Sequence, residues 1–189
     1  MGWGEGSDYS GMATDDTLTA AVGRSAAELM WDDSQGTNLQ MALFDAVGKE
    51  LGVPVHQLLP GGKMRDWVPL SWWCHSNAPD EWAEEARLAV AAGYTTCKYK
   101  ARPWWDIVQQ VQAVAAVVPD DFVMDIDFNM TLHNAASAMP VLKKLEAFPI
   151  VGMIESPVPQ EDIAANQQIR AAQSKPVAMC ATYSPHPRL

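Results

Sequence analysis

The sequence has few of the residues that mark disulfide-rich or zinc-binding proteins. Its 189 residues include only three cysteines and four histidines. Cys74, Cys97 and Cys180 are an odd number without the spacing of a zinc site, and the histidines form no HxxxH or HExxH motif. Such cysteine usage is typical of a reducing compartment. We therefore expect a cytoplasmic protein whose cysteines are simply buried.

Long apolar runs and basic residues are also scarce. No stretch is long and apolar enough to span a membrane, and the N-terminus lacks the basic start and apolar core of a secretory signal. The 13 basic residues are outnumbered by 23 acidic ones, so the formal net charge is −10. This charge argues against nucleic acid as the main partner, although it is compatible with a local cationic site for a small anion.

From residue 66 onward, segments with strand character alternate with segments of helical periodicity. We expect strands at 66–73, 94–100, 121–127, 149–156 and 175–180, and helices at 79–93, 104–119, 135–148 and 161–173. Such alternation is typical of a parallel sheet. The sequence has no GxGxxG or GxxxxGK[ST] motif, so a nucleotide-binding sheet would lack its phosphate loop. Polar residues instead follow successive strands, at the end where α/β barrels carry out chemistry.

These observations predict an α/β protein, a partial (β/α)8 TIM-type barrel of about five parallel strands and four helices. The expected domains are a flexible segment over 1–24, a helical region over 25–65 and the partial barrel over 66–189. In the helical region, Thr37 or Asn38 can cap a helix that Gly52 ends. A closed barrel takes about 250 residues. The chain should therefore be a fragment or pair with another chain, such as a second copy; relaxation into an open, flavodoxin-like sheet is the competing solution.

Charged residues are paired along the predicted strands. Alternation places Lys98 and Lys100 on one face of a strand, and Asp125 and Asp127 on one face of the next, with Asn129 just beyond. Charges are rarely buried at such positions without a partner. The pairs Lys98–Asp125 and Lys100–Asp127 could be simple cross-strand ion pairs.

A catalytic interpretation requires the next strand as well. Alternation there places Val151, Met153 and Glu155 on one face. Two neighbouring carboxylates, Asp127 and Glu155, suit Mg²⁺, which takes one or two of them and completes its shell with water and substrate oxygens. A dication and a second lysine would lower the pKa of Lys100, making it a general base for removing a proton alpha to a carboxylate. Arg102 could clamp that carboxylate.

The order of these motifs resembles the mandelate racemase and muconate lactonizing enzyme branch of the enolase superfamily. "CKYK" is similar to that family's K-x-K motif, "DIDFNMTL" to its D-x-N motif and "GMIESPVPQED" to its fourth-strand segment. "MALFDAVGKELGVPVHQLLPGG" resembles the junction between a helical capping domain and the barrel. The region over 25–65 would then be a remnant of the capping domain.

The resemblance implies a Mg²⁺-dependent sugar-acid dehydratase or racemase that acts on a small carboxylate or sugar-acid substrate. Lys100 would be the acid/base residue, with Lys98 as its auxiliary. Asp127 and Glu155 would be metal ligands, supported by Asn129.

The sequence also departs from the family pattern. Ala181 stands where the family supplies a third carboxylate ligand, and Ser156 stands where many relatives have a second acidic residue. The later barrel strands and the N-terminal sheet of the capping domain are missing. Two alternatives therefore stay open: a catalytically inactive truncated relative with a structural or interaction role, and an open-sheet module that binds a small anion.

Overall fold

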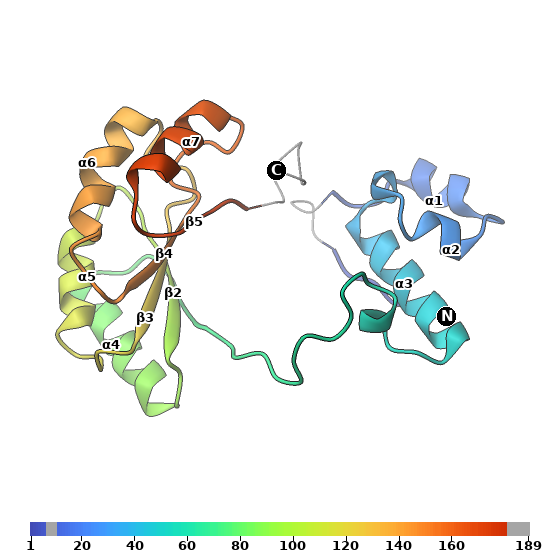
Figure 1. Cartoon of the computed structure of the whole chain (residues 1–189), viewed down its shortest axis with the longest axis horizontal. Helices are drawn as coiled ribbons and strands as arrows, with labels where there is room; N and C mark the ends of the chain where they lie inside the picture. Colours follow the sequence, from blue (N-terminus) through green and yellow to red (C-terminus); the bar gives the residue numbers. More distant parts are fainter. Residues whose placement is uncertain (7–10, 181–189) are drawn as a thin grey trace. The chain divides into compact units, whose positions relative to one another are not determined.

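The computed structural model describes residues 1–6 and 11–180 and divides the chain into two units, Met1–Val68 and Pro69–Leu189 (Figure 1). The division follows an exposed segment over 61–71 that carries neither helix nor strand. The domain boundaries expected from the sequence, after residues 24 and 65, stay predictions. Each unit is described by itself.

The N-terminal unit is helical. Its elements are α1 (Asp15–Ala21), α2 (Ala26–Leu29), α3 (Thr37–Leu51) and the 3-10 turns η2 (Asp33–Gln35) and η3 (Val55–Gln57). The side-chain cap expected from Thr37 or Asn38 is wrong, because Gly36 is the N-cap residue of α3. Its φ of +80° and its approach to the backbone of Ala13 leave no room for a β-carbon. Gly52 ends α3 in a left-handed conformation, as predicted.

The C-terminal unit is a five-stranded parallel sheet covered by helices. Its strands are β1 (Trp72–Cys74), β2 (Thr96–Lys100), β3 (Val123–Asp127), β4 (Val151–Glu155) and β5 (Val177–Ala178). Its helices are α4 (Pro79–Ala91), α5 (Ile107–Ala115), α6 (Ala135–Leu145) and α7 (Ile163–Ala172). The predicted alternation is confirmed, although the first strand is shorter than expected and begins beyond Pro69, which cannot donate a ladder hydrogen bond.

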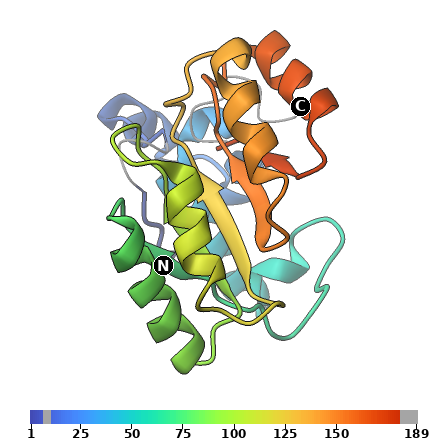
Figure 2. The same ribbon diagram turned by 90° about the vertical axis from the view of Figure 1, so that its left-hand side faces the viewer.

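The order of the strands identifies the architecture as barrel-like. The strands follow one another as β1-β2-β3-β4-β5, and every pair is parallel. Right-handed crossovers between successive neighbours place all four helices on one face of the sheet (Figures 1 and 2). A flavodoxin-like sheet would reverse its strand order and carry helices on both faces. The partial (β/α)8 architecture is therefore confirmed, and the open, flavodoxin-like sheet is not observed.

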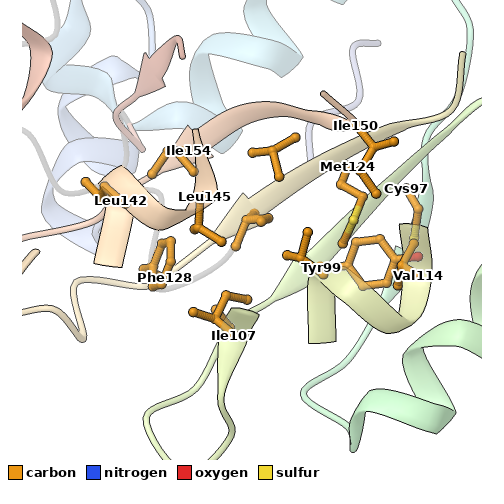
Figure 3. Packing of buried hydrophobic residues seen from close by; sticks show 14 of the residues in the cluster. Cys97, Tyr99, Ile107, Val114, Met124, Phe128, Leu142, Leu145, Ile150 and Ile154 are labelled. Atoms are coloured by element: carbon orange, nitrogen blue, oxygen red, sulfur yellow. The ribbon is translucent and has the colours of Figure 1, made fainter. Parts of the chain in front are cut away.

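The hydrophobic core lies between the sheet and the helices. Alternate strand residues supply it, including Cys97 and Tyr99 of β2 and Met124 of β3, which pack with Val114 of α5 and Leu145 of α6 (Figure 3). All five of these side chains are fully buried. Burial of these residues turns the intervening residues of each strand to the opposite, helix-free face of the sheet.

A β-bulge interrupts the pairing of β3 with β4. Met124 pairs with Val151, but Asp125 pairs with Met153, so β4 has one extra residue, Gly152. The expectation that Val151 shares a face with Met153 is therefore wrong, because the bulge turns Val151 into the core, where it is 1% exposed. Beyond the bulge the register recovers, and Asp127 pairs with Glu155.

Candidate functional site

Charged side chains gather on the helix-free face, at the carboxyl ends of β2, β3 and β4. Lys100 pairs in register with Asp127, and Asp127 with Glu155, so one row across the sheet holds a lysine and two carboxylates. Lys98 lies one row deeper, in register with Asp125. This is the rim at which the sequence predicted a site.

Both lysines form ion pairs with the carboxylates of the upper row. The Lys100 ammonium donates to Oδ2 of Asp127 at 2.5 Å. The Lys98 ammonium donates to Oε2 of Glu155 at 2.5 Å and also lies 3.5 Å from Oδ2 of Asp127. Lys98 therefore bridges the two carboxylates, although their strands are separate. The alternative cross-strand ion pair between Lys98 and Asp125 is not among the ion pairs of the described residues, because the Lys98 ammonium reaches Glu155 instead.

Asp127 is the most enclosed member of the group, with 1% of its side chain exposed. The backbone N–H of Asn129 donates to its Oδ1 at 2.8 Å, and the Asn129 side chain donates to its Oδ2 at 3.2 Å. Asn129 thus makes two hydrogen bonds to one carboxylate, and its role in a site stays a prediction. They hold the Asp127 carboxylate in a fixed orientation.

Strained backbone surrounds these carboxylates. Within the described residues, four non-glycine residues have positive φ, and all lie in the loops that follow β3 and β4: Asn129, Met130, His133 and Ser156. The loops hold each other, since the Met130 N–H donates to the Ser156 carbonyl at 2.7 Å. Strain of this kind costs about 1–3 kcal/mol per residue and is concentrated at functional sites.

Electrostatic interactions stabilise the ionised forms of Asp127 and Lys98. Burial opposes ionisation of Asp127, but the hydrogen bonds from Lys100 and Asn129 and the charges of the two lysines outweigh it and lower the pKa of Asp127. Burial also opposes the charged form of Lys98. The hydrogen bond to Glu155 and the nearby carboxylate charges outweigh that effect and raise the pKa of Lys98.

Asp125 differs from Asp127 although both face the same side of the sheet. Burial raises the pKa of Asp125; the charge of Lys98 opposes this shift and the charge of Glu155 adds to it. Asp125 thus has no strong stabilising partner for its charge, because the Lys98 side chain extends past it to the upper row. The choice of Asp127 as a metal ligand, which the D-x-N resemblance implies, stays a prediction.

Arg102 lies outside the ion-pair group. Its guanidinium donates to the carbonyl of its neighbour Ala101 at 2.7 Å. Its side chain lines a separate cavity of about 290 Å³ with Trp105, Phe128 and Thr131, among other residues. A role for Arg102 in substrate binding stays a prediction.

One aromatic residue lies on this face. Trp73 pairs in register with Lys98 on the helix-free face and is 50% exposed. Its ring meets His75 edge to face at 4.5 Å. Its neighbour Trp72 instead packs against Tyr94. Strict alternation along "WWC", with Cys74 buried, is the signal that separates the two tryptophans.

The carboxylate pair is chemically suited to a hard divalent cation. Asp127 and Glu155 already converge on one cationic group, the Lys98 ammonium, and carboxylate oxygens are ligands that Mg²⁺ accepts. Over the described ranges, no group of three His, Cys, Asp or Glu side chains lies close enough to hold a metal. Ala181, at the expected third ligand position, lies outside the described residues.

A sequence match over the C-terminal unit establishes the family to which the chain belongs. A family model for the enolase C-terminal domain-like family matches residues 81–183, more than half of the chain, and covers β2, β3 and β4 with their charged residues. The chain belongs to this family. The resemblance to the mandelate racemase and muconate lactonizing enzyme branch of the enolase superfamily is thereby confirmed.

Relatives of this enolase-family chain are racemases and sugar-acid dehydratases. The N-succinyl-L-Arg/Lys racemase of Bacillus cereus is 31% identical over 140 residues, which are 74% of this chain and 37% of the racemase. The D-gluconate dehydratase of Thermoproteus tenax is 31% identical over 153 residues, covering 75% of this chain and 30% of the dehydratase. The chain thus spans about a third of the length of these relatives.

Solved structures support the enolase-family fold. The structure of an N-succinyl Arg/Lys racemase from Bacillus cereus has a TM-score of 0.73 at 24% identity, covering 94% of this chain and 53% of that protein. A dipeptide epimerase from Enterococcus faecalis, solved with Mg and the dipeptide L-Leu-L-Tyr, has a TM-score of 0.67 at 20% identity, covering 75% of this chain and 39% of the epimerase.

None of the helices in the described part of the chain has the length and apolar character needed to traverse a bilayer.

Proposed function

We propose that this enolase-family chain carries the acid/base and cation-binding half of a site that removes a proton alpha to a carboxylate. The observation that supports this proposal is the convergence of Lys98, Lys100, Asp127 and Glu155 at the carboxyl rim of a barrel-type sheet. The reaction would be a racemisation or a dehydration, the two classes of activity found among its relatives.

Lys100 is the proposed acid/base residue. Its side chain is 20% exposed, so a substrate on the helix-free face can reach its ammonium. Asp127, held by Asn129, positions the Lys100 Nζ at 2.5 Å. In its neutral form, Nζ would accept the alpha proton and could return it, or pass it on, from the same face. Lys98 would bind the substrate carboxylate through its own ammonium.

Asp127 and Glu155 would hold a divalent cation, with Asn129 orienting the Asp127 carboxylate. When bound, Mg²⁺ supplies a Lewis acid that makes the alpha proton of a carboxylate substrate more acidic. The Mg-containing epimerase structure supports this choice of ion. Two protein carboxylates are within the range that Mg²⁺ uses when water and substrate oxygens complete its shell.

The proposed substrate is a small carboxylate, in the range between an acyl-amino acid and a sugar acid. The exposure of the two lysines supports an anion, because the side chains of Lys98 and Lys100 are 30% and 20% exposed whereas that of Asp127 is 1% exposed. We also propose that the open edges of the sheet are covered when the site is active, by a second copy or by further chain.

Two measurements test this function. Isothermal titration with Mg²⁺ should show binding that Asp127→Asn removes. Nuclear magnetic resonance in D₂O should show Mg²⁺-dependent exchange of the alpha proton of N-succinyl amino acids or sugar acids, lost in Lys100→Ala and retained in the exposed control Lys144→Ala. Absence of both cation binding and exchange in the wild-type chain would contradict the proposal.

A non-catalytic structural or interaction role is the second candidate. It is favoured by the lack of a three-ligand metal group among the residues the structure describes. The two candidates differ in the exchange experiment, since a structural relative would exchange no alpha proton at any Mg²⁺ concentration.

A further inference from the structure

Lys98 is the one side chain of the ion-pair group that contacts both proposed cation ligands. Its Nζ lies 2.5 Å from Glu155 and 3.5 Å from Asp127, whereas Lys100 contacts Asp127. A positive charge between two carboxylates is also what a bound dication would provide. The Lys98 ammonium therefore has the contacts of a cation bound by this pair.

Both oxygens of Asp127 already accept hydrogen bonds, and Oδ2 is the more crowded of the two. Its Oδ2 accepts from Lys100 at 2.5 Å and from the Asn129 side chain at 3.2 Å, with the Lys98 ammonium at 3.5 Å, and its Oδ1 accepts from the Asn129 backbone at 2.8 Å. A cation that binds Oδ2 must displace one of these donors. The Lys98 ammonium is the farthest of the three from Oδ2.

The geometry of Lys98 also allows its ammonium to move away from the two carboxylates. Its backbone lies one row below the carboxylates, in register with Asp125, and the side chain extends upward to reach them. The four-carbon stem of a lysine can change rotamer without backbone movement. Lys98 is 30% exposed, more than Lys100 at 20%. Its ammonium can therefore return to solvent, whereas Lys100 is more enclosed.

From these contacts we propose that Lys98 sets the affinity of the site for a divalent cation by competing for the shared carboxylates Asp127 and Glu155. This inference rests on the proposed cation site. The two carboxylates balance the charges of the two lysines, so a dication enters a neutral group. Without the Lys98 charge the group is negative and attracts a dication more strongly.

The experiment compares Mn²⁺ binding, followed by electron paramagnetic resonance of the free ion, for four chains. Mn²⁺ accepts the same oxygen ligands as Mg²⁺. We expect Lys98→Met to bind Mn²⁺ about tenfold more tightly than the wild type, and Lys100→Met to gain less because Lys100 contacts one carboxylate. Lys144→Met, an equal charge change at an exposed residue of α6, should show no gain.

Each result bears on one proposal. Wild-type binding with no gain in Lys98→Met, or with equal gains in Lys98→Met and Lys144→Met, would overturn the competition while leaving the cation site in place. Absence of Mn²⁺ binding in all four chains at millimolar concentrations would instead overturn the proposed cation site. If circular dichroism shows that Lys98→Met is unfolded, Lys98→Gln, which keeps a hydrogen-bond donor without the charge, replaces it with the same expectation.

Discussion

Asp125 and Asp127 are two residues apart on one strand and face the same side of the sheet. Their surroundings nevertheless shift the pKa of the two carboxyl groups in opposite directions. Asp127 is held by two lysines and two hydrogen bonds from Asn129. Asp125 is partly buried, and burial raises its pKa. Position along a strand therefore does not by itself decide whether a carboxylate is stabilised; the reach of neighbouring side chains does.

We predict that Asp127→Asn and Asp125→Asn differ in their effect on the free energy of unfolding at pH 7. Asp127→Asn leaves two lysine charges without their shared partner and should cost about 2 kcal/mol. Asp125→Asn removes a charge that burial disfavours, so stability should be unchanged or higher. Urea denaturation measures both, and an equal loss in the two variants would contradict the assigned surroundings.

The lowered pKa of Asp127 predicts a specific pH dependence. A carboxyl whose folded pKa lies below its unfolded value of about 3.9 stabilises the fold above that pH, and the contribution is lost as pH falls toward the folded pKa. The stability difference between the wild type and Asp127→Asn should therefore shrink between pH 6 and pH 3. Because Glu146, whose pKa is lowered to about 2, is present in both chains, its contribution cancels. A difference that stayed constant over this range would refute the prediction.

At the scale of elements, the bulge in β4 positions the site. It adds Gly152 on the helix-free face and turns Val151 into the core, and it allows Glu155 to pair with Asp127. Without the extra residue, alternation would direct Glu155 to the helix side. The pairing of Asp127 with Glu155 therefore depends on a backbone irregularity three residues before Glu155.

We predict that Gly152→Ala destabilises the chain by about 1–3 kcal/mol, as overpacking does. A β-carbon at residue 152 would lie 2.4 Å from Cγ1 of Val123 and 3.1 Å from Oδ1 of Asp125. Thermal unfolding measures the loss. Adding Val123→Ala removes the nearer clash, so the double variant should lose less stability than the sum of the losses in the two single variants. A loss in the double variant greater than that sum would count against this packing.

At the scale of the whole molecule, the two units are joined by an exposed segment. Residues 61–71 are exposed throughout and carry Lys63 and Arg65. Limited trypsin digestion should therefore cut first after Lys63 or Arg65 and leave the C-terminal unit intact. Mass spectrometry of the early fragments checks this. The variant Lys63→Gln/Arg65→Gln should delay the cut, and first cleavage inside α4 to α7 would contradict the division.

Much of the architecture could be predicted from the sequence, because helices and strands of a parallel α/β unit have distinct periodicities. The four helices and five strands of the C-terminal unit follow the predicted alternation, with shorter ends. The start of α3 and the length of β1 could not be predicted. The first depends on the close approach of Ala13 to Gly36, and the second on which residues of the segment pair with β2.

The sequence by itself determined which residues are available to the site, since strand alternation places Lys98 and Lys100 on one face, and motif order selects Asp127 and Glu155. Only the tertiary structure decided their partners. Lys98 extends past Asp125 to Glu155, and Val151 turns inward while Glu155 does not. The physical reason is that contacts between separate strands depend on register, on a bulge and on which partner each side chain reaches, none of which is set by the local order of residues.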